Sequence, residues 1–285
     1  MRRVTAADGV ELALHRLRAY RDRRPAVLLV HGAFSSHTVW IRPVTPQGGL
    51  AHYLLDRGFD VWLGDLRHHG ESDREPQPRQ WRFEDWILHD APALVDRVKE
   101  ETGYAPLAWG GHSAGGVVGL CWLARMARAR AEAPLEAAVT FGAPGPGRMG
   151  VARWWGAATT MAICRALGRF PARAFRFGSE DEAAEILAQW MRWNVRGGWV
   201  GTDGFDYFAA LGEVRTPLLS VAGEADTLFA PSQACREVVE RAGAVRKALL
   251  VYPHLSHKGM LLDPRARERC WPELADRLGE ILTPA

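Results

Sequence analysis

Short, fully apolar runs alternate with segments of helical period along most of this chain. The run at 26–30, for example, has no polar residue and opens directly into His31 and Gly32. A strand that is apolar at every position is typical of a parallel sheet covered by helices on both faces. Similar runs lie at 61–63, 107–109, 137–141, 218–222 and 248–252, with helix-type segments at 47–58, 84–102, 114–130, 231–243 and 264–282. This alternation predicts an α/β fold with a doubly wound, mostly parallel sheet.

One stretch interrupts the alternation. The segment 142–147 reads Gly-Ala-Pro-Gly-Pro-Gly, residues that break regular structure. No strand pattern follows it before the next apolar run, whereas 181–196 places its apolar residues on one helical face. We therefore expect a helical cap at 145–212, inserted into a core formed by 1–144 and 213–285.

The composition excludes several classes of protein. With 285 residues, 47% of them apolar and 24% charged, the chain is not disordered, collagen-like or a coiled coil. It is long enough to bury a core without a disulfide or a structural metal. The net charge is +3, and the basic residues form no stripe with interleaved aromatics, which argues against a nucleic-acid partner.

The cysteines and the N-terminal residues bear on location. The four Cys stand apart in the sequence and in no zinc-type spacing, as expected in a reducing compartment. Residues 1–14 lack the apolar core of a signal peptide, and we find no apolar run long enough to span a membrane. We expect a cytoplasmic protein without integral membrane association, and the sequence leaves its oligomeric state open.

The segment 107–116 carries the motif with chemical meaning. It contains Gly111-His112-Ser113-Ala114-Gly115, between an apolar run and a helix-type segment. A tight strand-to-helix turn of this kind exposes a serine hydroxyl at a helix N-terminus. Ser113 is therefore the candidate nucleophile, and the backbone N–H of Ala114 is a candidate donor to an oxyanion.

An acid and a base follow in the order that such a serine requires. Asp226 leaves the apolar run 218–222 after Gly223 and is the preferred acid over Glu224, with Asp203 and Asp206 as weaker candidates. The loop after 248–252 offers two bases, His254 and His257, and spacing does not choose between them.

The second oxyanion donor is expected in the loop after 26–30. Gly32 permits a close backbone approach, so the N–H of Ala33 is the natural donor and that of Phe34 the alternative. We interpret His31 as a structural hydrogen-bonding residue of this loop.

Taken together, these motifs resemble the α/β-hydrolase superfamily over essentially the whole chain. Three further stretches, 58–65, 83–103 and 256–261, are similar to its serine esterase and lipase branch, which includes acid lipases and related bacterial esterases. The resemblance favours His257 as the base, because relatives often place the catalytic His after Gly or Ser and before x-Gly-hydrophobic. The acid-lipase pattern, His followed by Leu, instead favours His254.

The chain also departs from that branch. Ala114 stands where many members carry Gln, and the usual Arg-Gly-x-Gly after the fourth strand reads Arg67-His68-His69-Gly70. We interpret the histidine pair as a loop variant, because no third metal ligand stands at a suitable spacing. No metal and no cofactor are expected. The cap is short for enclosing a large lipid, and the candidate pocket residues are Phe34, His112, Trp154, Trp155 and Trp190.

These residues imply a serine hydrolase that cleaves a carboxylic ester of a small to medium apolar substrate through an acyl-enzyme. Thioesterase, lactonase and acyltransferase activities on the same triad are the enzymatic alternatives. A serine at position 113 argues against epoxide hydrolase and dehalogenase activity, whose relatives carry Asp there. The non-enzymatic alternative is a hydrolase-like protein that only binds its ligand. The expected partner is in each case a small molecule.

Overall fold

The protein is built on one eight-stranded sheet. The computed structural model describes residues 1–76, 80–147 and 151–283; within 151–167 it describes the side chains from Trp155 onward. The strand order is β1-β2-β4-β3-β5-β6-β9-β10. The strands are β1 (Arg2–Thr5), β2 (Glu11–Arg16), β3 (Ala26–Val30), β4 (Asp60–Asp65), β5 (Leu107–His112), β6 (Ala137–Phe141), β9 (Leu218–Gly223) and β10 (Lys247–Tyr252). The β1–β2 and β2–β4 pairs are antiparallel and all other neighbours are parallel, so the predicted sheet is confirmed.

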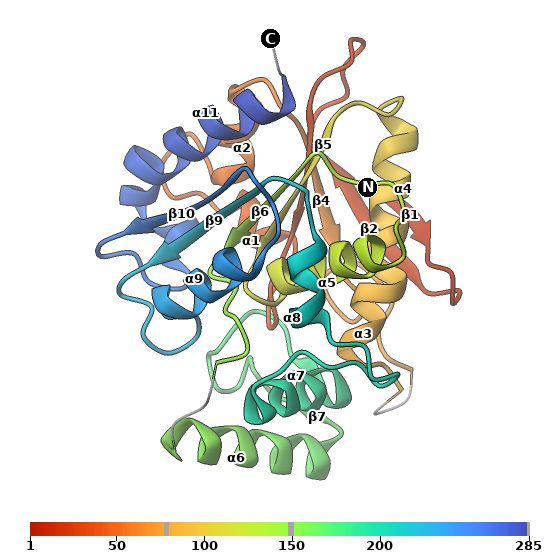
Figure 1. Ribbon diagram of the computed structural model, residues 1–285, viewed down its shortest axis with the longest axis vertical. Helices are drawn as coiled ribbons and strands as arrows, with labels where there is room; N and C mark the ends of the chain where they lie inside the picture. Colours follow the sequence, from red (N-terminus) through yellow and green to blue (C-terminus); the bar gives the residue numbers. More distant parts are fainter. Residues whose placement is uncertain (77–79, 148–150, 284–285) are drawn as a thin grey trace.

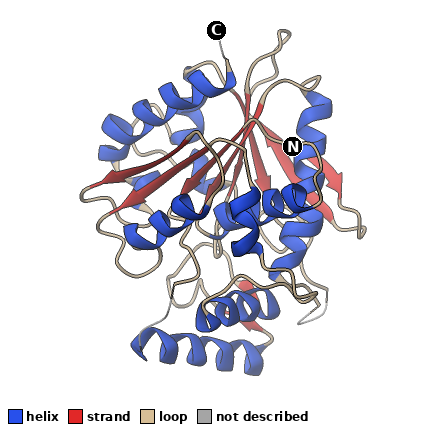
Figure 2. Cartoon of the chain, viewed as in Figure 1, coloured by secondary structure: helices blue, strands red, loops and turns tan. Residues whose placement is uncertain are grey.

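Helices cover both faces of this sheet, as Figure 2 shows. Along β3, Leu28 belongs to the core beneath α4 (Ala91–Glu101) and α5 (Ala114–Arg128), with part of α9 (Ser232–Arg241). Its neighbour Leu29 belongs to the opposite core, beneath α2 (Leu50–Asp56) and α11 (Trp271–Leu282). Successive strand residues point to opposite faces, so a strand covered twice must be apolar at every position.

Shorter helical segments connect these elements. They are α1 (Thr38–Ile41), α3 (Phe83–Asp85), η1 (Trp86–Asp90), α8 (Tyr207–Ala210), η2 (Leu211–Glu213), α10 (Gly259–Leu262) and η3 (Ala266–Cys270). In the part of the chain that the structure describes, no helix has the length and apolar character needed to cross a membrane. The four cysteines are buried and free.

A separate helical layer lies between β6 and β9 in the sequence. It contains α6 (Val151–Leu167), β7 (Arg169–Phe170), β8 (Glu182–Ala183) and α7 (Ala184–Arg196). In Figure 1 this layer lies below the sheet, beyond the ends of the strands that lead into it. Sequence analysis found no strand here, but β7 and β8 form a small antiparallel pair. Strands of two residues are too short to produce a periodic pattern. The exact division at 145 and 212 stays a prediction.

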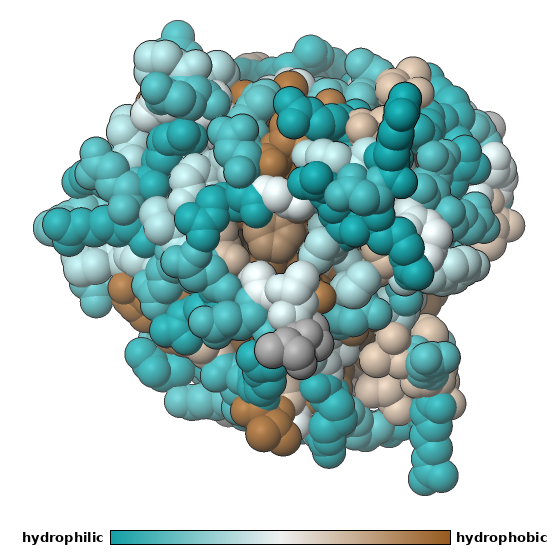
Figure 3. Space-filling model, turned by 90° about the horizontal axis from the view of Figure 1, so that it is seen from above, coloured by the Kyte–Doolittle hydropathy of each residue, from teal (hydrophilic) through white to brown (hydrophobic). Residues whose placement is uncertain are grey.

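The opposite end of the molecule is mostly polar. Figure 3 views the protein from that end, and hydrophilic side chains cover most of the visible surface. Large exposed apolar side chains occur in the helical layer, among them Trp155, Phe175 and Phe177, and also before the starts of β5 and β10, at Tyr104 and Val245.

A buried arginine ties three segments of the core together. Arg67, which follows β4 and is fully buried, donates through Nε to Asp90 Oδ1 at 2.8 Å. Its two terminal nitrogens donate to Asp8, in the turn between β1 and β2, at 2.6 and 3.0 Å. The Arg67 N–H adds a 2.9 Å hydrogen bond to Asp90. These contacts fix the loop 66–70 against the core.

Removing Asp90 should leave this buried guanidinium with only Asp8, whose side chain is 29% exposed, as its counter-charge. We expect Asp90→Ala to lower the free energy of unfolding by about 3–5 kcal/mol, the usual effect of breaking a buried ion pair. Urea unfolding followed by circular dichroism measures it. Asp8→Ala is the comparison, since the Asp8 side chain is 29% exposed and its loss should cost less. Equal losses in the two variants would contradict this account.

Candidate active site

Ser113 occupies a strained turn between β5 and α5. Its φ and ψ are 51° and −121°, a conformation that residues with a side chain rarely adopt. Gly111 and Gly115 make the turn possible. A Cβ at Gly111 would lie 2.4 Å from the Gly115 oxygen, and one at Gly115 would lie 2.3 Å from the His31 oxygen. The Ser113 N–H donates to the Phe141 oxygen at 2.8 Å, which fixes the turn against β6.

The structure brings Asp226 and His257 into contact. Asp226 lies in the loop after β9 and His257 in the loop after β10, and Nδ1 of His257 lies 2.5 Å from Asp226 Oδ2. Asp226 also accepts the N–H groups of Phe229 and Ala230 at 3.0 and 3.1 Å. Burial acts to raise the pKa of Asp226, but His257 and these N–H groups outweigh it and hold the pKa below its usual value. Asp226 is therefore ionised and oriented toward the imidazole.

The alternative acids and base lie elsewhere. His254 is exposed, and its backbone oxygen accepts a hydrogen bond from Arg265. Glu224 is also exposed. Asp203 pairs with Arg125 at 2.6 Å, and Asp206 caps α8 by accepting the Ala209 N–H. Among the acids and bases that the sequence offered, Asp226 and His257 are the two that the described residues show in contact.

The loop after β3 is held by His31. The Leu66 N–H donates to His31 Nε2 at 3.1 Å, so Nδ1 carries the proton and donates to the Gly32 oxygen at 2.8 Å. Complete burial, with a smaller effect of His69, lowers the pKa of His31 to about 4. This neutral, fully engaged imidazole confirms the structural interpretation of His31.

The same loop lies directly against the turn at Ser113. A Cβ at Gly32 would be 2.9 Å from both the Ser113 Cβ and the His112 oxygen, so only glycine allows this approach. Within the described ranges, the N–H groups of Ala33 and Ala114 donate no hydrogen bond. The N–H of Phe34, the alternative donor, contacts Glu182 Oε2 at 3.4 Å. Ala33 and Ala114 thus each have an N–H group without an acceptor among the described residues. They follow Gly32 and Ser113, the two residues at which the loop and the turn meet.

His112 packs against His257. Its ring centroid lies 4.7 Å from that of His257, and its Nε2–H donates to the His257 oxygen at 3.1 Å. Burial and the neighbouring His257 lower the pKa of His112 to about 3, so the donor is a neutral imidazole. Sequence analysis placed His112 in the pocket. In the structure it is only 4% exposed and contacts the loop of the base.

A hollow of about 380 Å³ opens beside His257. Its apolar wall consists of Phe177, Leu228 and Phe229, and the Phe229 ring lies 5.0 Å from the His257 ring. Sequence analysis missed these three residues. Leu228 and Phe229 directly follow the Asp226 loop, so their position was a usable signal, whereas Phe177 is brought in by tertiary packing.

The aromatic pocket candidates lie in other places. Phe34 packs on Phe170 and Phe177, at centroid distances of 5.6 and 6.3 Å. Trp190 stacks on Phe83 at 5.1 Å. Trp155 is 62% exposed on α6, and the side chain of Trp154 falls outside the described residues. Their assignment to the pocket stays a prediction.

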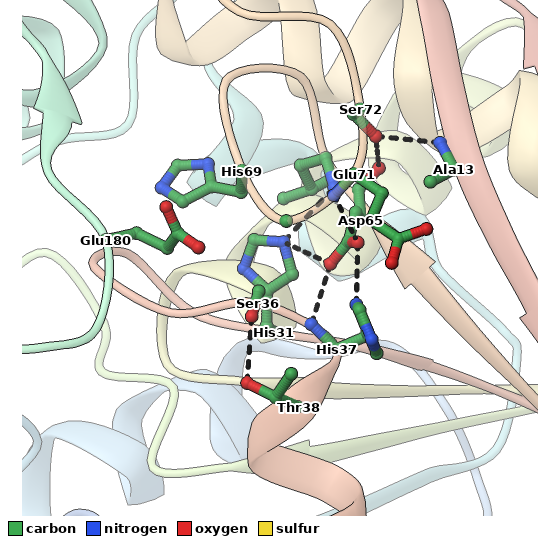
Figure 4. Close-up of polar contacts among 12 residues, drawn as sticks. Ala13, His31, Ser36, His37, Thr38, Asp65, His69, Glu71, Ser72 and Glu180 are labelled. Atoms are coloured by element: carbon green, nitrogen blue, oxygen red, sulfur yellow. Dashed lines mark hydrogen bonds and ion pairs between the residues drawn. The ribbon is translucent and has the colours of Figure 1, made fainter.

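A polar network around Asp65 supports the loop after β3 (Figure 4). The buried Asp65 carboxylate accepts the His37 N–H and the Glu71 N–H at 2.7 and 3.0 Å, and lies 2.7 Å from His37 Nδ1. Burial acts to raise its pKa, but the neighbouring His15 and His37 outweigh this and lower it. The ring of His15 stacks on His37 at 4.0 Å.

This network also contains the one group of possible metal ligands found among the described residues. Ligand atoms of His15, His37 and Asp65 lie within 4.8 Å of one another. A divalent ion would have to displace the hydrogen bond between His37 and Asp65. The sequence did not reveal this group, because its members come from three distant segments.

A buried ion pair joins the helical layer to the core. His69 Nε2, in the loop after β4, lies 3.3 Å from Glu182 Oε2 in β8, and both side chains are fully buried. Burial acts to lower the pKa of His69 and to raise that of Glu182. Their mutual attraction outweighs both effects, so the pKa of His69 is raised and that of Glu182 lowered. The pair anchors the layer next to Phe34.

Known proteins resemble this chain in sequence. A family model described as alpha/beta hydrolase fold matches residues 25–155. Gastric triacylglycerol lipase of Bos taurus is 33% identical over 132 residues, which cover 42% of this chain and 33% of the relative. Lipase lipl-3 of Caenorhabditis elegans is 32% identical over 126 residues, covering 39% and 31%. The match thus spans about a third of the length of these relatives.

Solved structures resemble the whole chain. A thermophilic esterase from Thermogutta terrifontis superposes with a TM-score of 0.69 at 17% identity, covering 99% of both chains. A monoacylglycerol lipase from Paleococcus ferrophilus gives 0.65 at 18% identity, covering 94% of this chain and 98% of that one. Likeness at this identity establishes the fold.

The pair of His69 and Glu182 should make stability depend on pH. Because folding raises the pKa of His69, its contribution to the free energy of unfolding is complete below the unfolded pKa of 6.5 and is lost as the pH rises through the folded pKa. Because folding lowers the pKa of Glu182, its contribution is present above the unfolded pKa of 4.5 and is lost as the pH falls through the folded pKa. The pair should therefore stabilise the fold most between pH 4.5 and pH 6.5.

We expect Glu182→Gln to lower the free energy of unfolding by about 1.5–3 kcal/mol in that window, the range for a hydrogen bond to a charged group. The loss should shrink at higher pH. Urea unfolding from acidic to alkaline pH measures it. Glu185→Gln, which removes a partly exposed pair with Arg192, is the control and should change little. A loss that did not vary with pH would argue against this coupling.

Proposed function

The chain has the α/β-hydrolase fold and resembles the esterases and lipases of that superfamily, and from this premise we propose that it is a serine hydrolase. Its substrate is a carboxylic ester of small to medium apolar character, cleaved through an acyl-enzyme. The observation that carries the proposal is the 2.5 Å contact of His257 Nδ1 with Asp226. The ring of His257 lies 4.7 Å from that of His112, the residue before Ser113, whose φ is 51°.

The first half of the reaction acylates Ser113. Asp226 engages His257 Nδ1, which leaves Nε2 as the atom that removes the proton from the Ser113 hydroxyl. The serine oxygen attacks the ester carbonyl, and the resulting oxyanion accepts hydrogen bonds from the N–H groups of Ala33 and Ala114. Each such donor contributes about 3 kcal/mol in enzymes where it has been removed. The tetrahedral intermediate collapses, and His257 returns the proton to the leaving alcohol.

The second half restores the enzyme. His257 removes a proton from water, and the hydroxide attacks the acyl carbonyl. The same two N–H groups stabilise the second oxyanion. Ser113 leaves with the proton from His257, and the carboxylic acid departs. The N-terminus of α5, which begins at Ala114, adds a favourable dipole to both oxyanions.

Labelling with a fluorophosphonate tests the nucleophile directly. Intact-mass measurement should find one adduct on the folded wild type and none on Ser113→Ala. A panel of p-nitrophenyl esters of increasing chain length, with a thioester and a lactone, then ranks the acyl bonds. Added alcohol distinguishes transfer from hydrolysis. A folded wild type without any adduct would overturn the proposal and favour a protein that only binds its ligand.

Substitutions at the three residues should have graded effects. We expect Ser113→Ala and His257→Ala each to lower kcat about 10⁶-fold, and Asp226→Asn about 10⁴-fold, as in serine proteases with the same roles. The matched controls are His254→Ala and Glu224→Gln, which alter exposed residues of the same two loops. Steady-state kinetics on one soluble ester gives the ratios. A large loss of kcat in His254→Ala with a small loss in His257→Ala would assign the base to His254. The same result for Glu224→Gln against Asp226→Asn would assign the acid to Glu224.

Gly32 offers a separate test of the oxyanion donors. A methyl group there would push on Ser113 and on the His112 oxygen, each 2.9 Å away, and should displace the Ala33 N–H. We expect Gly32→Ala to lower kcat by about 10²–10³-fold, the effect of losing one donor. Gly279→Ala is the control, because a Cβ at Gly279 would meet no atom within 4 Å. Circular dichroism checks that both variants fold. Unchanged turnover in folded Gly32→Ala would exclude this role of the loop.

A further inference from the structure

A second hollow, of about 660 Å³, adjoins the one beside His257. The two hollows share Arg176 and Lys258 in their walls. The second hollow lies between the core segment 35–43, which includes α1, and the segment 173–179 of the helical layer. Through Arg176 and Lys258 it continues the hollow that His257 lines.

The walls of this hollow carry positive charge. Its charged lining residues are Arg42, Arg173, Arg176 and Lys258, and its lining includes no acid. Arg173 lies 3.6 Å from Asp181. Across the described residues, Arg42, Arg176 and Lys258 have no ion pair. Elsewhere on the surface, many arginines lie beside a carboxylate, as Arg277 does with Glu273 at 2.9 Å. The hollow therefore concentrates cations that lack an internal counter-charge.

Lys258 and Arg42 line the same hollow, and their like charges repel each other. Burial and the positive charge of Arg42 hold the pKa of Lys258 below its usual value. Lys258 Nζ donates to the Phe177 oxygen at 2.5 Å, which fixes the ammonium between core and helical layer. An ammonium has three donors, so two remain for a ligand. An anion bound here would relieve the repulsion and accept these N–H groups.

The neighbouring hollow adds an apolar requirement. Phe177, Leu228 and Phe229 line the space between His257 and the shared residues Arg176 and Lys258. Lys258 directly follows His257 in the chain. A ligand that fills both hollows would therefore combine a reactive ester, an apolar stretch and a negatively charged end.

We propose that the substrate of this site carries an anionic group, a carboxylate or a phosphate, which binds among Arg42, Arg176 and Lys258 while its ester lies at Ser113. This inference rests on the proposed function. It assigns a substrate class, an acyl ester with an apolar body and an anionic end, and makes the cationic hollow a specificity site outside the catalytic residues.

Matched soluble esters test the assignment. One series comprises mono-p-nitrophenyl esters of dicarboxylic acids, the second the same molecules with the free carboxylate capped as a methyl ester. The third carries a terminal phosphate. All are used below the concentration at which they aggregate, which excludes a lipid surface as the source of any preference. We expect kcat/KM to favour the anionic over the capped ester about ten- to a hundredfold at low salt, as for charge-assisted hydrogen bonds. Added salt should reduce the preference.

Charge-matched variants locate the effect. In Arg42→Gln/Arg176→Gln the preference should fall at least about tenfold, with a smaller change in the hydrolysis of the capped ester. Arg57→Gln/Arg277→Gln removes the same charge from exposed positions, one just after α2 and one on α11, and should keep the preference. The ratio between the carboxylate and phosphate series identifies the preferred anion.

The outcomes separate the two proposals. Equal hydrolysis of anionic and capped esters, or a preference that survives in Arg42→Gln/Arg176→Gln, overturns the anionic substrate and leaves the serine hydrolase intact. If the preference for the anionic ester falls equally in both double variants, the effect comes from net charge, and the anionic-substrate proposal is overturned too. Absence of turnover for every ester, together with no fluorophosphonate adduct on folded protein, overturns the hydrolase itself.

Discussion

The close approach of three backbone segments at the end of β5 is the constraint on which the rest of this structure depends. Gly111, Gly115 and Gly32 each lie where a Cβ would be less than 3 Å from a neighbouring main-chain atom. Because these segments touch, β3 must be next to β5, and the loop after β3 must meet Ser113. The sheet order, the strained serine and the two unengaged N–H groups are thus aspects of one packing arrangement.

His257, the proposed base, enters this arrangement from the edge strand β10. His257 comes from the loop after β10, two strands beyond β6, and fits because Gly142 leaves room for it. A Cβ at Gly142 would lie 3.1 Å from His257 Nδ1, and its φ of +59° independently favours glycine. Asp226 then contacts the imidazole, whereas His112 donates to the backbone oxygen of His257 and packs beside its ring. The position of His257 is set by contacts within the protein.

Sequence reasoning could predict what short-range patterns encode. The strands were readable because a strand covered on both faces is continuously apolar, and Ser113 because its glycines adjoin it in the chain. Spacing does not decide whether His254 or His257 pairs with Asp226, since both lie in one loop and only its folded path separates them; the resemblance alone favours His257. The contacts of His69 with Glu182, and of His15 and His37 with Asp65, join distant segments whose residues carry no periodic signal.

The attachment of the helical layer divides it into an inner and an outer part. Glu182, Phe177 and the Glu180 N–H, which donates to the Phe34 oxygen at 3.1 Å, bind the inner segment to the core. By contrast, α6 packs against α7 and β7 and lies farthest from the sheet in Figure 1. Ile163 and Cys164 of α6 belong to one cluster with Phe34, whereas Trp155 of the same helix is exposed. Sequence divergence should therefore be concentrated on the exposed face of α6, while the segment beneath it changes slowly.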